Sequence, residues 1–90
     1  MSLPAAQRAI ESVIGLYNSG KLKQAVAVAR KLIRAHPDTP MLYNVLGASL
    51  AARKRYREAI AAYSKLLELE PNLAPGYMNL GHAQRGLGDI

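Results

Sequence analysis

The sequence predicts an all-α fold of five helices, built from a repeated pair of antiparallel helices. The segment HPDTPMLYNVLG, residues 36–47, shares its skeleton with EPNLAPGYMNLG, residues 70–81. Proline, tyrosine, leucine and glycine recur at an offset of 34 residues, a period typical of stacked helical repeats. Between these segments the apolar residues have the spacing of one helix face, and turn residues interrupt the pattern where helices would end.

The predicted helices span residues 4–18, 21–35, 40–52, 55–69 and 74–87, in the order A, B, A, B, A. The first ends at Asn18-Ser19-Gly20, because glycine tolerates the left-handed conformation that closes a helix. The second ends before Pro37, which lacks a backbone donor. Its apolar stripe consists of Leu22, Ala25, Val26, Ala29, Leu32 and Ile33.

The third helix has a clear start signal, since Thr39 can act as its N-cap and Pro40 suits its first position. The fourth ends before Pro71, and the fifth follows it. The apolar stripe of the fourth helix repeats that of the second and consists of Tyr56, Ala59, Ile60, Tyr63, Leu66 and Leu67.

Two glycines occupy the middle of A helices, where glycine costs about 1 kcal/mol relative to alanine. They are Gly47 and Gly81, 34 residues apart. We expect each to allow close approach of the following B helix, with Ala25 and Ala59 as the matching small residues on the B helices.

Composition limits the chain to one small domain over residues 1–90, because 90 residues cannot bury a second core. The sequence has no cysteine, which excludes disulfides, cysteine-ligated metals and a cysteine nucleophile. Charged residues interrupt every apolar run well before the roughly 20 residues that cross a bilayer, and no signal-peptide pattern begins the chain. We therefore expect no membrane partner, and a cytoplasmic location by default.

No residue pattern predicts an enzyme, a cofactor or a metal site. His36 and His82 lie on different elements without acidic or cysteine partners at ligand spacing. The glycines at 81, 86 and 88 have neither a preceding strand nor the Lys-Ser/Thr of a phosphate loop. The sequence offers no partner carboxylate or cleft for general acid–base catalysis by Glu11, Glu58, Glu68 or Glu70.

These repeats resemble the tetratricopeptide repeat (TPR) family, a 34-residue helix-turn-helix unit that stacks into a right-handed superhelix. The repeats would cover residues 6–39, 40–73 and, in part, 74–90. The family usually has glycine in the turn from helix A to helix B, where this chain has Lys54. The second repeat fits best, through Tyr43, Leu46, Gly47, Leu50, Tyr56, Ala59, Tyr63, Leu66 and Pro71.

The resemblance implies a protein-interaction scaffold that binds an extended or helical peptide on a concave face lined by the A helices. Apolar side chains beside amides suit such a ligand, although the same residues could instead pack against neighbouring repeats. The expected face comprises Ile10, Ile14, Tyr17, Asn18, Met41, Asn44, Val45, Met78, Asn79, His82 and Arg85, with Gln7, Glu11, Ala48 and Ala52 beside them.

One specialised version of the family grips a C-terminal carboxylate with lysine, arginine and asparagine side chains. The corresponding places in this chain hold Ile10, Ile14, Val45, Pro75 and Asn79. Four of the five cannot donate a side-chain hydrogen bond, so we do not expect this chain to bind a ligand in that way.

Two alternative functions remain open. The last helix keeps apolar Leu80, Ala83 and Leu87, so it could join two copies in a homo-oligomer or stack on another domain. A basic edge at the turns from A to B helices could meet an acidic protein or nucleic acid, but Tyr56, its one aromatic residue, is needed for packing. This edge consists of Lys21, Lys23, Arg53, Lys54, Arg55 and Arg57, and the net charge of +6 would speed encounter with acidic partners.

Overall fold

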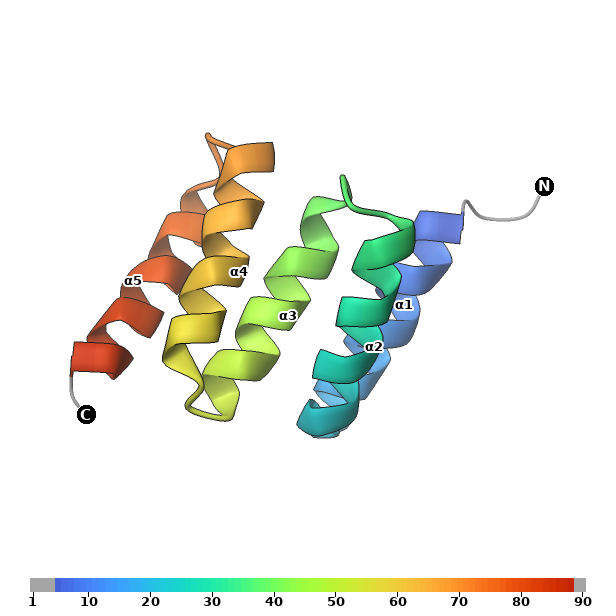
Figure 1. Cartoon of the computed structure of the whole chain (residues 1–90), viewed down its shortest axis with the longest axis horizontal. Helices are drawn as coiled ribbons and strands as arrows, with labels where there is room; N and C mark the ends of the chain where they lie inside the picture. The colour runs from blue at the N-terminus through green and yellow to red at the C-terminus, as the bar shows by residue number, and fades with distance from the viewer. Residues whose placement is uncertain (1–4, 89–90) are drawn as a thin grey trace.

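The computed structural model describes residues 5–88, which form five helices joined by short turns and contain no strand. The helices are α1 (Ala5–Asn18), α2 (Leu22–Ala35), α3 (Pro40–Ala52), α4 (Tyr56–Leu69) and α5 (Ala74–Gly88) (Figure 1). Every predicted boundary within these residues is confirmed to within one residue. The predicted start of the first helix at residue 4 lies outside the described residues.

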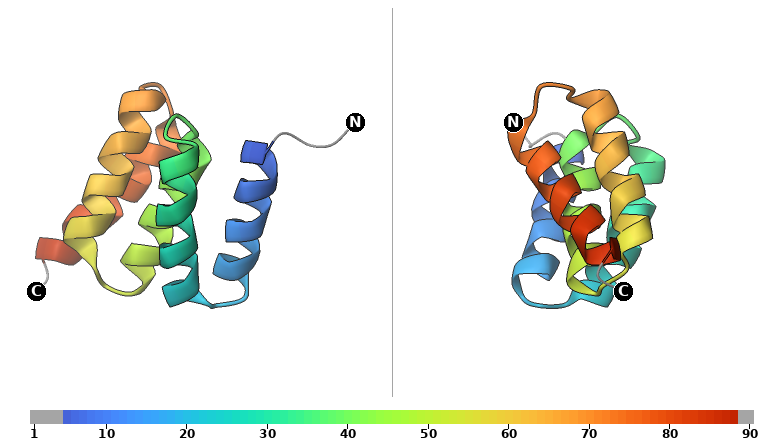
Figure 2. Two further views of the ribbon diagram at one scale, coloured as in Figure 1. Left: turned by 45° about the vertical axis from the view of Figure 1, so that its right-hand side comes forward. Right: turned by 90° about the vertical axis from the view of Figure 1, so that its left-hand side faces the viewer.

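The helices form a stack in which each packs on the next along the chain. Helix α3 also contacts both α1 and α5, so α1, α3 and α5 form one side of the stack. Helices α2 and α4 form the other side, and α3 and α5 run behind them in the left view of Figure 2. The arrangement is the stacked A, B, A, B, A order that the repeat predicts.

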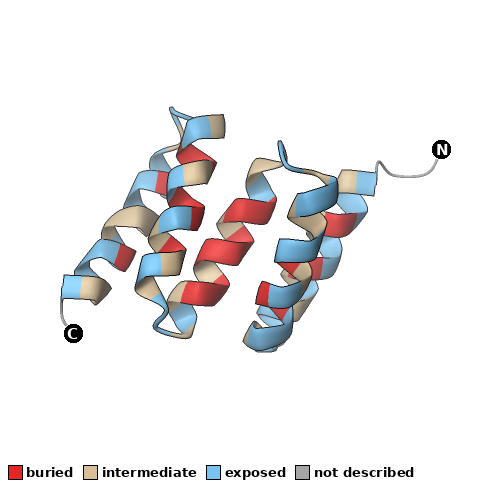
Figure 3. Cartoon of the chain, in the orientation of Figure 1, coloured by how far each residue is buried: buried red, intermediate tan, exposed pale blue. Residues whose placement is uncertain are grey.

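Helix α3 is the centre of the core, since it packs against four neighbouring helices. Its Leu42 and Leu50 are fully buried, and burial extends along most of its length (Figure 3). Buried Ser49 donates its hydroxyl hydrogen bond to the carbonyl oxygen of Val45 at 2.8 Å, so its polar group is satisfied inside the helix. The flanking helices fit against an apolar surface on nearly every face of α3.

The recurring tyrosine and proline are joined by a hydrogen bond in both repeats. The Tyr43 hydroxyl donates to the carbonyl oxygen of Pro37 at 2.7 Å, and the Tyr77 hydroxyl donates to that of Pro71 at 2.8 Å. Each bond fastens the loop after a B helix to the first turns of the next A helix. The two residues recur together because they form one contact between successive repeats.

The close approach predicted at Gly47 is confirmed, but its partner is Tyr63 rather than Ala59. A Cβ on Gly47 would lie 2.6 Å from Cε1 of the Tyr63 ring, which is closer than van der Waals contact allows. For Gly81 the same expectation stays a prediction, and a Cβ there would meet no described atom within 4 Å. No helix follows α5 in the described part of the chain, so nothing there packs on Gly81 as α4 packs on Gly47.

The turn after each complete A helix contains a residue in the left-handed conformation. Gly20 has φ of 75° after α1, and Lys54 has φ of 61° at the equivalent position after α3. Lysine thus adopts a conformation that favours glycine. Thr39 is the N-cap residue of α3 and Pro40 follows it as predicted, although the Thr39 side chain makes no capping hydrogen bond.

Candidate functional site

The side formed by α1, α3 and α5, named the A face below, carries a cavity of about 330 Å³. It opens where α1, the start of α3 and the loop after α4 meet. The cavity is lined by Ile10, Met41 and Asn44, which were predicted, and by Thr39, Pro40, Leu66, Glu70 and Leu73, which were not. The antiparallel pairing of α3 with α4 explains Leu66, Glu70 and Leu73, because it brings the end of α4 and the loop after it beside the start of α3.

Two predicted asparagines join α3 to α5 beside this cavity. The Asn79 amide nitrogen donates to Oδ1 of Asn44 at 3.2 Å, and the Asn44 amide nitrogen lies 3.6 Å from the sulfur of Met41. An amide group carries two donor protons, so both side chains retain a donor for a further partner. Both are only half-buried, which leaves these groups within reach of a ligand.

The α5 part of the A face is the most exposed. Met78 exposes 64% of its surface, and the neighbouring Tyr77 exposes 52%. His82 and Arg85 are also exposed, and the Arg85 guanidinium contacts Nδ1 of His82. This end of the face therefore offers a large apolar side chain beside a cationic group.

The α1 part of the A face is better packed. Ile10 and Ile14 are half-buried against the core, whereas Tyr17 and Asn18 at the end of the helix are exposed. The structure does not bring Tyr17 or Asn18 into the cavity lined by Ile10. The predicted face is thus an apolar cavity at one end with scattered exposed residues beyond it.

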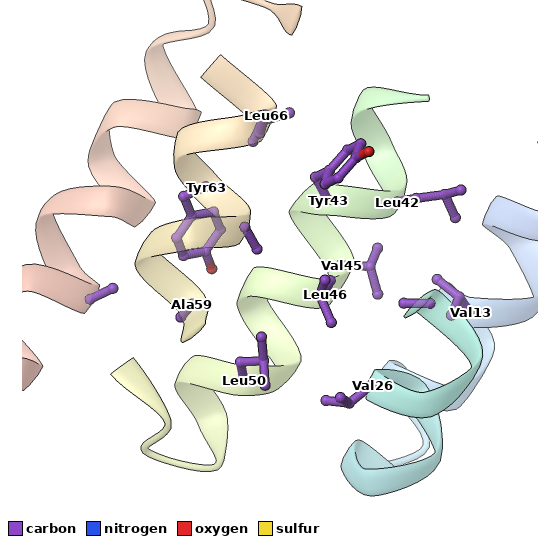
Figure 4. Packing of buried hydrophobic residues seen from close by; sticks show 13 residues of the cluster. Val13, Val26, Leu42, Tyr43, Val45, Leu46, Leu50, Ala59, Tyr63 and Leu66 are labelled. Carbon is purple, nitrogen blue, oxygen red and sulfur yellow. The ribbon is translucent and has the colours of Figure 1, made fainter. Parts of the chain in front are cut away.

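Val45 does not face a possible partner, and its assignment to the exposed face was wrong. Its side chain is only 6% exposed and points from α3 towards Val13 of α1 (Figure 4). Helix α3 contacts α1 as well as α2, so this position lies between helices rather than on the surface.

The basic residues of the two A-to-B turns lie along one edge of the stack, because both turns are at the same end of the helices (Figure 1). One member is already paired: Nε of Arg55 donates to Oε1 of Glu58 at 2.6 Å. Arg30, from α2, donates to the other carboxylate oxygen of Glu58 at 2.6 Å. Hydrogen bonds from Arg30 and then Arg55 lower the pKa of Glu58. Arg53 is half-buried, and the exposed members are Lys21, Lys23, Lys54, Arg55 and Arg57.

Within residues 5–88 there is no cluster of three histidine or acidic side chains that could hold a metal ion. The same residues contain no helix whose length and apolar character would let it cross a membrane.

Comparison with known proteins places this geometry in a family. The sequence model of the tetratricopeptide repeat family matches residues 11–74 of this chain. A wheat (Triticum aestivum) protein named Hsp70-Hsp90 organizing protein is 37% identical over 81% of this chain and 13% of its own length. The peroxisomal targeting signal receptor of Saccharomyces cerevisiae is 33% identical over 88% of this chain and 14% of its own length.

A second peroxisomal targeting signal receptor, from Candida albicans, is 35% identical over 72% of this chain and 11% of its own length. The chain spans well under a quarter of each of these relatives. The repeated Tyr–Pro contact and the stacked helix pairs agree with the repeat architecture that the matching family model describes. The chain belongs to the tetratricopeptide repeat family.

Proposed function

We propose that this chain is a protein-interaction scaffold that binds a peptide segment of another protein on its A face. The observation that supports the proposal is the cavity at Ile10 and Met41 beside the linked amides of Asn44 and Asn79. A bound peptide needs a pocket for a side chain and fixed polar groups for its backbone. Here both lie within one stretch of surface formed by α1, α3 and α5.

The chemistry of the cavity favours an apolar anchor residue in the ligand. Its walls are mostly aliphatic, and Glu70 is the charged side chain that lines it. A carboxylate placed there would be repelled by Glu70 and would meet no lysine or arginine among the lining residues. We therefore infer an internal peptide segment with a buried aliphatic side chain, rather than a C-terminal carboxylate, as the ligand.

The names of two relatives agree with a role in binding proteins or peptides. One is a receptor for a peroxisomal targeting signal and the other is an organizing protein for Hsp70 and Hsp90. The donors that grip a carboxylate in one version of the family are absent at Ile10, Ile14 and Pro75. The partner of this chain is accordingly proposed by the chemistry of its cavity rather than by the names of its relatives.

A selection of short random peptides against the whole chain tests this proposal. Selected peptides should lose about tenfold or more in affinity for Met41→Glu and Asn44→Ala, because both changes alter the cavity. Gln24→Ala, at an exposed position of α2, is the matched control and should leave the affinity unchanged. Equal affinities for all three variants would reject the A face as the binding site.

A second candidate function is self-association or stacking through α5, and it rests on the open surface at Gly81. The equivalent Gly47 is covered by the Tyr63 ring, whereas Gly81 has no described neighbour there. Tyr77 is exposed and lies one helical turn before Gly81 on the same face of α5. A helix with an aromatic residue, from a second copy or another domain, could pack on Gly81 as α4 packs on Gly47.

Sedimentation velocity at several protein concentrations tests the second candidate. Self-association through α5 predicts a sedimentation coefficient that rises with concentration, and Gly81→Glu should abolish the rise by placing a charge on the contact. A coefficient that stays at the monomer value throughout would reject stacking between copies.

A further inference from the structure

A groove of about 470 Å³ lies on the opposite side of the stack from the A face cavity, between α2 and α4. Helices α2 and α4 do not pack on each other, and α3 is visible between them in Figures 1 and 3. This groove, named the B groove below, is lined by Arg30, Ile33, Arg34, Tyr43, Leu46, Leu50, Glu58, Ala61, Ala62 and Lys65.

The floor and lower walls of the B groove are apolar. Leu46 and Leu50 come from α3, Ile33 comes from α2, and Ala61 and Ala62 come from α4. Ile33 is only half-buried and Ala61 is exposed. Because the two alanine side chains are short, the backbone of a partner helix could approach α4 to the usual interaxial distance of about 8–10 Å.

The rim of the B groove carries basic side chains on both walls. Arg34 stands on α2 and Lys65 on α4, and neither makes an ion pair within the described residues. Glu58, the acidic member of the lining, is already held by Arg30 and Arg55. Helix α2 itself has four basic residues and no acidic one. An apolar floor between unpaired cations is therefore complementary to an apolar ligand with carboxylates along its sides.

We propose that the B groove binds an acidic amphipathic helix of a partner protein. Such a helix would place apolar residues at i, i+3, i+4 and i+7 on the floor and glutamate or aspartate beside the rim. Arg34 on α2 and Lys65 on α4 line the groove from its two walls, and neither makes an ion pair within the described residues. A carboxylate on each flank of the partner helix would therefore meet one unpaired cation.

This site is independent of the peptide site proposed above. The B groove shares no lining residue with the cavity on the A face. The two sites also differ in chemistry, because the B groove has a basic rim, whereas the charged side chain that lines the A face cavity is the acidic Glu70. One chain could thus hold two different segments, one on each side of the stack.

A designed peptide of about four helical turns serves as the probe. It has leucine at the stripe positions, glutamate on both flanks and a fluorescein label, and its binding to the full chain is followed by fluorescence anisotropy. Three control peptides are used: a scrambled sequence of equal composition, a version with lysine in place of glutamate, and a version with a central proline that prevents a continuous helix.

Matched protein variants locate the site. Arg34→Gln removes a rim charge, and Ala61→Gln fills the groove from an exposed position. Lys31→Gln removes the same charge from the same helix outside the groove. Circular dichroism shows whether each variant is folded before its affinity is compared.

The proposal predicts saturable binding of the helical acidic probe alone. Arg34→Gln and Ala61→Gln should each weaken it by about fivefold or more, and Lys31→Gln by less than about twofold. Absence of binding, equal binding of the scrambled or proline peptide, or an equal loss in Lys31→Gln would overturn it. If Asn44→Ala lost affinity for the probe while Arg34→Gln kept it, the probe would bind on the A face, and this result would also overturn the proposal.

Discussion

The ring of Tyr63 occupies the space that a Cβ on Gly47 would need, with Cε1 2.6 Å from that position. Tyr63 is itself buried between α3 and its neighbours, so its ring has little room to move. Glycine is therefore required at position 47 by α4, although it weakens α3 as a helix. The contact sets how closely the two helices of the second repeat can approach.

Gly47→Ala should lower the free energy of unfolding by about 1–3 kcal/mol, because the added methyl group overpacks the contact with Tyr63. Gly81→Ala is the matched control, since a Cβ there meets no described atom within 4 Å. It should raise the free energy of unfolding by up to about 1 kcal/mol through better helix propensity. Urea unfolding measures both; equal effects of the two substitutions would contradict the close packing of α4 on Gly47.

Lys54 is predicted to be a site where glycine stabilises the chain. Its φ of 61° is a left-handed conformation that costs a residue with a side chain about 1–2 kcal/mol. Lys54→Gly relieves this cost, but glycine also gives the unfolded chain more conformational entropy, which favours unfolding. The net effect should be a rise of about 0.5–1 kcal/mol in the free energy of unfolding. Gly20→Ala, at the equivalent turn, should lower it, and thermal unfolding of both variants checks the pair. A destabilised Lys54→Gly variant would show that the lysine side chain contributes more than the strain costs.

The tyrosine hydroxyls of the two equivalent loops should differ in their contribution to stability. Tyr43→Phe removes a part-buried hydrogen bond to Pro37 and should cost about 1 kcal/mol. Tyr77→Phe removes an exposed bond to Pro71, which competes with water, and should cost less. Denaturant unfolding of both variants gives the comparison. No loss in Tyr43→Phe would mean that the recurring tyrosine is kept for packing alone.

Alkaline pH should destabilise the chain through Tyr63. Burial, with a smaller effect of Tyr17, raises the pKa of Tyr63 to about 12 from an ordinary value of 10.0. The folded state therefore favours the neutral phenol of Tyr63. The contribution of this phenol to the free energy of unfolding is complete below pH 10 and is lost as the pH rises towards 12. Urea unfolding between these pH values should show a shallower decline for Tyr63→Phe. Parallel declines in the two proteins would assign the pH dependence to other groups.

The sequence was sufficient to predict the helices because their signals are local. Pro37, Pro71 and Gly20 mark ends, and the 34-residue offset of Tyr43 and Tyr77 aligns the repeats. Contacts between helices were harder to predict. The space beside Gly47 is filled by Tyr63 rather than Ala59, which lies one turn earlier on the same face of α4, because the position of α4 along its axis is set by the packed core and not by spacing alone.

The candidate sites were only partly predictable for the same reason. Val45 has the helical phase of the A face but is covered because α3 also contacts α1. Leu73 and Glu70 line the cavity because the end of α4 returns beside the start of α3. The B groove joins Arg34 and Lys65, which belong to two different helices and share no motif in the sequence.

Photocrosslinking tests most directly whether the A face binds peptides. A photoreactive amino acid is introduced at Met41, which is exposed beside the cavity, or at Ala27, which is exposed on α2. We expect a selected peptide to crosslink to the Met41 derivative and not to the Ala27 derivative. Crosslinks at Ala27 with none at Met41 would contradict peptide binding on the A face.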